Sequence, residues 1–199
     1  MKKEKSILIV DDSKLNIRVL SDILKEKEYR IALARSGKIA LEFVEMKKPD
    51  LILLDIMMPE IDGFEVCARL KANPETKNIP IIFISGLDKS EHIVRGFKVG
   101  AVDYIVKPFQ KEVVLARVDT HLKLNETQRK LKRKNRELKK LLNEVEYLSF
   151  HDEMTGLYNR RYFENELERL SASRRLPLTL LVADMDKLKV VNDNYGHKM

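Results

Sequence analysis

Five short apolar segments, separated by segments with helical periodicity, constrain the fold more than any other feature of this sequence. The apolar segments are residues 7–10, 31–34, 51–54, 81–84 and 104–106. Helices are predicted between them at residues 14–27, 37–46, 63–72 and 91–99, and a fifth begins near Gln110. Uninterrupted apolar strands belong to sheets covered on both faces, and strands that alternate with helices form parallel sheets. We therefore predict an α/β fold with a doubly wound, five-stranded parallel sheet.

Polar residues follow four of the five predicted strands. They are Asp11 and Asp12 after the first strand, Asp55 after the third, Ser85 after the fourth, and Lys107 with Pro108 after the fifth. Because the carboxyl ends of parallel strands share one edge of a sheet, binding sites form there. Three carboxylates at one edge repel one another unless a cation neutralises them, and Mg²⁺ prefers oxygen ligands. One carboxylate could then attack a phosphoryl group while the cation, lysine and hydroxyl stabilise the developing charge.

Four motifs at these strands carry a family resemblance: ILIVDDS, PDLILLDIMMPEIDGFEVCARLK, IPIIFISG and GAVDYIVKPF. Together they closely resemble the receiver domain of two-component response regulators, from residue 6 to about residue 122. The resemblance implies that a histidine kinase or phosphotransfer protein phosphorylates Asp55. It implies Mg²⁺ ligands at Asp11, Asp12, Asp55 and the backbone carbonyl of Met57. It also implies switch roles for Lys107, which pairs with the phosphorylated aspartate, Ser85, which bonds to the phosphoryl group, and Tyr104, which rotates inward.

The formal net charge of +7 is concentrated in one segment. Residues 123–140 hold nine Lys or Arg and two Glu, so the rest of the chain is balanced. A seven-residue apolar repeat runs through Leu124, Leu131, Leu138 and Val145, joined by Leu141 and Leu148 at the second seam position. We interpret the segment as a parallel two-stranded coiled coil. A solvated single helix and a nucleic-acid-binding helix are alternatives, and nucleic acid is disfavoured because no base-reading residues are recognisable.

Beyond this helix, Asp152 and Thr155-Gly156 predict a turn before an amphipathic helix, and residues 178–183 predict a buried strand. The motifs HDEMTGLYNRR and ADMDKLKVVNDNYGH resemble the N-terminal half of a GGDEF domain, the diguanylate cyclase fold that makes cyclic di-GMP from two GTP. The resemblance implies metal binding by Asp184 and the Met185 carbonyl, and GTP contacts by Lys187, Leu188, Lys189 and Asn192. The hairpin that gives the family its name is absent, so we expect a truncated cyclase that is inactive in this chain and uses GTP only in a complete parent.

These segments predict three parts: a receiver domain at 1–122, a basic coiled-coil signalling helix at 123–149, and a partial α+β GGDEF segment at 150–199. The expected function is control of a diguanylate cyclase by phosphorylation of Asp55 and by homodimerisation through the receiver face, the coiled coil or both. A non-enzymatic adaptor with a receiver domain and a coiled coil is the alternative. No apolar run approaches the roughly 20 residues that span a membrane, and no signal peptide is recognisable, so we expect a cytoplasmic protein without a membrane partner. Asp103 and Lys98 are expected to be solvated charges near a face that many receivers use to dimerise.

Overall fold

The computed structural model describes residues 4–86, 90–172 and 179–183. The chain divides into two compact units, residues 1–135 and residues 136–199. The first unit holds a five-stranded parallel sheet with the strand order β2-β1-β3-β4-β5. Its strands are β1 (Lys5–Val10), β2 (Tyr29–Ala34), β3 (Leu51–Asp55), β4 (Ile81–Ser85) and β5 (Asp103–Val106). Its helices are α1 (Lys14–Leu24), α2 (Gly37–Met46), α3 (Gly63–Ala72), α4 (Ser90–Lys98) and the first part of α5 (Lys111–Phe150). The predicted α/β fold is confirmed.

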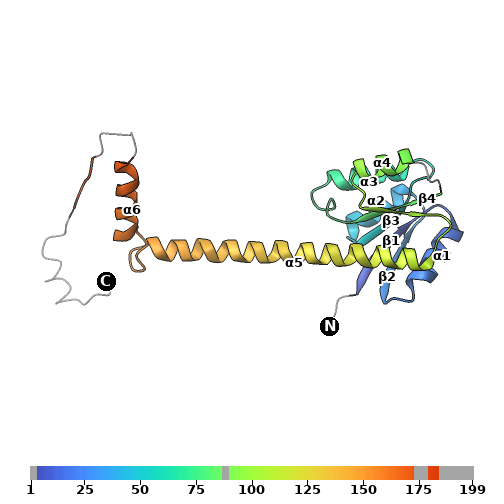
Figure 1. The fold of residues 1–199 in the computed structure, drawn as a ribbon, viewed down its shortest axis with the longest axis horizontal. Helices are drawn as coiled ribbons and strands as arrows, with labels where there is room; N and C mark the ends of the chain where they lie inside the picture. Colours follow the sequence, from blue (N-terminus) through green and yellow to red (C-terminus); the bar gives the residue numbers. More distant parts are fainter. Residues whose placement is uncertain (1–3, 87–89, 173–178, 184–199) are drawn as a thin grey trace. The chain divides into compact units, whose positions relative to one another are not determined.

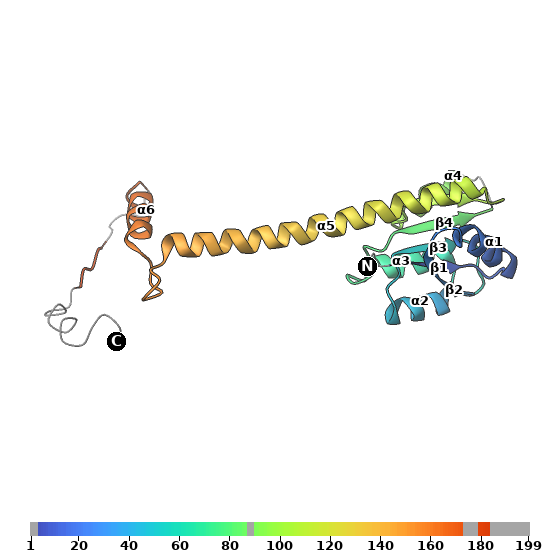
Figure 2. The same ribbon diagram turned by 90° about the horizontal axis from the view of Figure 1, so that it is seen from below.

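Helices cover both faces of this sheet (Figure 1). Helices α1 and α5 pack on one face, where Leu20 and Val118 meet the sheet residues Ile9 and Leu53 in one apolar cluster. Helices α2 and α3 pack on the other face in a second cluster, and Gly96 of α4 lies against the ring of Phe83 there. Figure 2 shows the same arrangement from below. All residues of β3 and β4 are buried, which explains why these strands are uninterrupted apolar runs.

Side-chain caps define where three of the helices begin. Ser13, Ser36 and Asp62 each accept a hydrogen bond from a backbone N–H in the first turn of α1, α2 and α3. Helix α1 ends at Leu24, three residues before the predicted end. The residues that follow, 25–28, are all charged and exposed, so they add no apolar contact to hold a further helical turn on the sheet.

In the second unit, a turn joins the end of α5 to α6 (Arg160–Ser171). The Asp152 carboxylate accepts hydrogen bonds from the N–H groups of Met154 and Thr155, and Gly156 adopts a φ of +67° that favours glycine. Asn159 caps α6 by accepting from the Tyr162 N–H, and its amide group donates to the Ser149 carbonyl oxygen of α5. The predicted turn and helix are confirmed.

The buried strand predicted at residues 178–183 is wrong for the part that the structure describes. Residues 179–183 belong to no strand, and Leu181 and Val182 are 89% and 82% exposed. A strand forms only where neighbours accept and donate its backbone hydrogen bonds, and no described segment pairs with these residues. Among the described residues, no helix is both long and apolar enough to cross a membrane.

Candidate functional site

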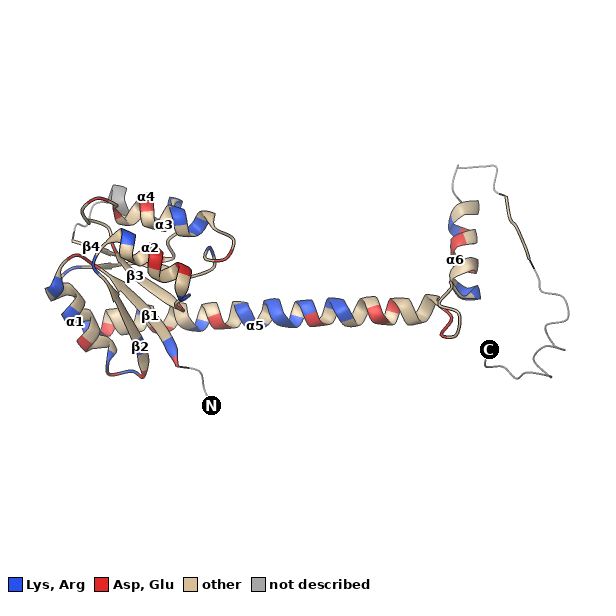
Figure 3. Ribbon diagram, turned by 180° about the vertical axis from the view of Figure 1, so that it is seen from behind, with Lys and Arg blue, Asp and Glu red and all other residues tan. Residues whose placement is uncertain are grey.

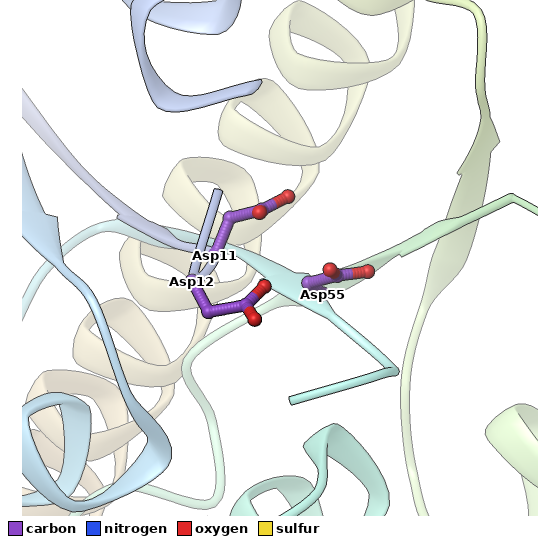
Figure 4. A group of neighbouring side chains, drawn as sticks. All are labelled: Asp11, Asp12 and Asp55. Carbon is purple, nitrogen blue, oxygen red and sulfur yellow. The ribbon is translucent and has the colours of Figure 1, made fainter. Parts of the chain in front are cut away.

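Three carboxylates meet at the carboxyl edge of the sheet (Figure 4). Asp11 and Asp12 directly follow β1, and Asp55 is the last residue of β3. These strands are neighbours, with Val10 opposite Leu54, so their ends coincide. One oxygen from each of the three carboxylates lies within 4.8 Å of the other two. Asp11 and Asp55 are buried, whereas Asp12 is exposed.

Lys107 connects two of these carboxylates. Its Nζ atom lies 3.1 Å from Asp55 Oδ2 and 3.2 Å from Asp11 Oδ2. The lysine follows β5, its own N–H donates to the Ser85 carbonyl oxygen at 2.8 Å, and its peptide bond to Pro108 is cis. The edge strand β5 therefore delivers a cation to acids that belong to β1 and β3.

Asn16 is a member of the site that the sequence did not single out. Its side-chain amide lies 2.9 Å from Asp11 Oδ2 and 3.1 Å from Asp11 Oδ1, and the Ser13 N–H donates to Asp11 Oδ1 at 2.8 Å. Both donors belong to the start of α1, where Ser13 is the N-cap. The direction of the Asn16 side chain depends on how α1 packs, which the sequence segments did not show.

The electrostatics of the cluster favour a bound cation. Burial, reinforced by the negative charge of Asp11, raises the pKa of the Asp55 carboxyl to about 6, while Lys107 and the Met57 N–H act in the opposite direction. One ammonium group cannot balance three ionised carboxylates. A compact, oxygen-only donor set with excess negative charge fits a hard divalent ion such as Mg²⁺.

Ser85 and Tyr104 lie beside this cluster rather than in it. Ser85 ends β4, is buried, and pairs in register with Val106 of β5. Both Ser85 and Tyr104 line a small cavity of about 10 Å³ together with Ile56, Phe83 and Phe97. The half-buried Tyr104 ring packs edge-on against Phe97, with 6.4 Å between the ring centroids.

Met57 follows β3 with an exposed side chain, and its N–H hydrogen-bonds to the Asp55 carboxylate. The sequence-predicted metal and GTP residues of the C-terminal segment, Asp184, Met185, Lys187, Leu188, Lys189 and Asn192, lie outside the described residues.

The expectation that Asp103 is a solvated charge is wrong. Its carboxylate forms an ion pair with Arg117 and a hydrogen bond with His121 Nε2 at 3.0 Å, and its side chain is only 16% exposed. Burial alone would raise the pKa of Asp103, but hydrogen bonds from Arg117, the Tyr104 N–H and His121 hold it below its usual range. The three side chains come together because β5 and α5 are adjacent, a contact that the separate sequence segments did not reveal.

Comparison with known proteins places this geometry in a family. Residues 7–119 match the response regulator receiver domain, and residues 149–199 match the family described as diguanylate cyclase, GGDEF domain. A probable cyclic di-GMP phosphodiesterase of Vibrio cholerae is 50% identical over 117 residues, which are 59% of this chain and 26% of that protein. Response regulator PleD of Caulobacter vibrioides is 41% identical over 112 residues, which are 56% of this chain and 25% of that protein.

Solved structures agree with these sequence matches. The crystal structure of a response regulator receiver domain protein (CheY-like) from Methanospirillum hungatei has a TM-score of 0.60 and 26% identity, and the match covers 63% of this chain and 99% of that one. The chain spans about a quarter of the length of the two curated relatives described above. The receiver match covers more than half of the chain and coincides with the acidic cluster and its lysine. The chain therefore belongs to the response regulator receiver domain family.

Proposed function

We propose that this chain is the regulatory part of a phosphorylation-controlled diguanylate cyclase, and that Asp55 is its phosphoacceptor. The observation that carries the proposal is the Lys107 ammonium group, held between the buried carboxylates of Asp55 and Asp11 at the carboxyl edge of the sheet. A nucleophilic carboxylate needs opposite charge close by when it receives a phosphoryl group. Lys107 supplies that charge to Asp55, and Asp11 and Asp12 are two further acids that can hold a cation beside it.

In the proposed reaction, an Asp55 carboxylate oxygen attacks the phosphorus of a phosphohistidine on a histidine kinase or phosphotransfer protein. A P–O bond to Asp55 forms, the P–N bond breaks, and the released imidazole takes up a proton. Bound Mg²⁺ supplies neutralisation of the phosphoryl oxygens, and the carboxylates of Asp11, Asp12 and Asp55 with the Met57 carbonyl would hold it. The Lys107 ammonium group stabilises the negative charge of the phosphoryl oxygens together with the cation.

Phosphorylation adds roughly two negative charges at Asp55. In the proposed switch, the Ser85 hydroxyl turns toward the new phosphoryl group, and the Tyr104 ring moves into the space that this releases. Ser85 and Tyr104 line the same small cavity, so the two side chains are close enough for a change at Ser85 to affect the packing around Tyr104, which supports the proposal.

The proposed output is dimerisation along α5, which brings two cyclase domains face to face. Leucines of the seven-residue repeat, among them Leu131, Leu138 and Leu141, are 55–59% exposed in the single chain, as expected for a seam that a second copy covers. Figure 3 shows the basic residues gathered along the middle of α5. We propose that the chain has three parts, at residues 1–122, 123–149 and 150–199. The receiver match at residues 7–119 lies within the first part, and the GGDEF match at residues 149–199 covers the last part. We also propose a cytoplasmic location.

A non-enzymatic adaptor remains the second candidate, because a receiver domain with an exposed apolar helical seam can act by binding alone. Reading the parent gene beyond Met199 for the GGDEF hairpin separates the two candidates. An intact hairpin supports the cyclase, and its loss supports the adaptor.

The phosphoacceptor is tested by incubating the chain and an Asp55→Asn variant with acetyl phosphate and Mg²⁺. Intact-mass spectrometry should show an adduct of about 80 Da, the mass of one phosphoryl group, on the native chain only. Light scattering should show association of the phosphorylated chain, which Leu138→Asp prevents and which Leu142→Asp, an equally exposed position outside the seam, leaves intact. Lack of an adduct would mean that Asp55 is not a competent acceptor under these conditions, and an equal adduct on Asp55→Asn would exclude Asp55 as the acceptor. An adduct without association would exclude the dimerisation step.

A further inference from the structure

Helix α5 is fastened by polar contacts to the edge of the sheet opposite the acidic cluster. Its buried residues end at Asn125, which is 6% exposed and whose side-chain amide donates to the Asp50 carbonyl oxygen at 3.1 Å. One turn later, Arg129 donates from Nη1 to Asp50 Oδ1 at 2.6 Å. Asp50 directly precedes β3, so both contacts are made at the amino-terminal edge of the sheet.

Asp50 is held in position from the sheet side, independently of the helix. Its Oδ2 atom accepts from the Ser6 N–H at 3.1 Å and from the Ser6 hydroxyl at 3.3 Å, and its own N–H donates to the Ser6 carbonyl oxygen at 2.8 Å. The Asp50 side chain is only 15% exposed. A carboxylate that is already oriented loses little freedom when it binds Arg129, so this pair differs from an ordinary surface ion pair.

Two flanking contacts extend the same stripe of α5. Glu126 pairs with Lys5 of β1 at 3.0 Å, and Lys132 Nζ lies 3.1 Å from the Asn78 side-chain oxygen, in the loop before β4. The helix residues in these contacts are spaced so that they occupy one side of the helix. We name the set formed by Asp50, Asn125, Glu126, Arg129 and Lys132 the basal clamp.

We propose that the basal clamp fixes the direction of α5 where the helix leaves the apolar core, so that residues 111–132 move as one rigid body with the sheet. Strand β3 has Asp50 just before its start and Asp55 at its end, about 16 Å apart at roughly 3.3 Å per residue. A shift of β3 along its length at the acidic cluster would therefore also displace Asp50 in the basal clamp. The use of this link to relay phosphorylation rests on the proposed function, whereas the rigidity does not.

Rigidity is measured by pulsed electron paramagnetic resonance between spin labels at Lys47→Cys, after α2, and Lys134→Cys, on α5 beyond the clamp. The buried Cys67 is replaced by Ala, and the labelled chain is diluted with unlabelled chain to suppress distances between copies. We expect a narrow distance distribution in the parent chain. Its width should increase about twofold in Arg129→Gln, because loss of the clamp lets the part of α5 beyond the apolar core open or swing. Arg136→Gln makes the same change on the same helix beyond the clamp and should leave the width unchanged.

Three results would overturn the proposal: a broad distribution in the parent chain, an unchanged width in Arg129→Gln, or equal broadening in Arg129→Gln and Arg136→Gln. Far-UV circular dichroism of each variant establishes that the fold is retained. Asp50→Asn, which keeps the shape of the side chain, provides a second variant that should broaden the distribution as Arg129→Gln does. The experiment uses no phosphoryl donor and no nucleotide, so its failure is distinguishable from failure of the proposed function.

Discussion

Replacement of Gly63 by alanine should destabilise the N-terminal unit at the point where the acidic cluster is built. A Cβ atom on Gly63 would lie 2.2 Å from the Asp55 carbonyl oxygen and 2.9 Å from the Ile56 Cα atom. Both are backbone atoms of a buried segment, so they cannot move aside as the end of a flexible side chain does. The Gly63 N–H also donates to the Ile56 carbonyl oxygen at 2.9 Å, and relief of the clash would strain this bond.

Overpacking of a well-packed core costs about 1–3 kcal/mol, and weakening of one hydrogen bond adds about 1 kcal/mol. We therefore expect Gly63→Ala to lower the free energy of unfolding by about 3 kcal/mol. At a urea dependence of about 2 kcal/mol per molar, the unfolding midpoint should fall by about 1.5 M.

The assay is urea unfolding of the full chain followed by far-UV circular dichroism. Gly86→Ala is the matched control, because a Cβ atom on Gly86 meets no atom within 4 Å. A Gly63→Ala midpoint equal to that of the control would refute the reasoning, since it would mean that β3 and α3 can separate at no cost.

Two further predictions concern pH and the second unit. In metal-free buffer, the pKa of Asp55 near 6 exceeds its ordinary value of 3.8, so the folded state retains a proton that the unfolded state has lost. Stability should fall by about 2 kcal/mol as pH rises from about 4 to about 6, and urea titrations of Asp55→Asn should lack this loss; an equal loss in the variant would assign it to another group. Asn159→Ala removes the cap of α6 and should speed amide exchange in the first turn of α6 about fivefold, measured by mass spectrometry. Asn143→Ala on α5 is the control and should leave exchange in that turn unchanged. Equal exchange rates in Asn159→Ala and the parent chain would show that the cap contributes nothing.

Much of the fold and part of the site followed from local sequence. Continuous apolar runs at β3 and β4 predict strands buried on both faces, and every residue of both strands is buried. The acids could be assigned to one edge of the sheet because parallel strands align their carboxyl ends. These inferences need only the pattern within each segment.

Contacts between distant segments required the tertiary structure. The sequence could not show that Lys107 bridges Asp11 and Asp55 or that Asp103 pairs with His121, because each contact depends on strand order and on the rotation of a packed helix. The apolar run at residues 178–183 gives the converse lesson. Its residues predict a strand, yet 179–183 form none, because the backbone hydrogen bonds of a strand are supplied by its neighbours.

By itself, the sequence determined the alternation of strands and helices, the sheet type and the residues that end each strand, since periodicity and capping act over a few residues. Only the tertiary structure decided which of these residues touch. Asp50 and Arg129 are 79 positions apart, and they meet because α5 crosses the sheet in one particular orientation. That orientation is set by side-chain packing over the whole core, which local patterns do not encode.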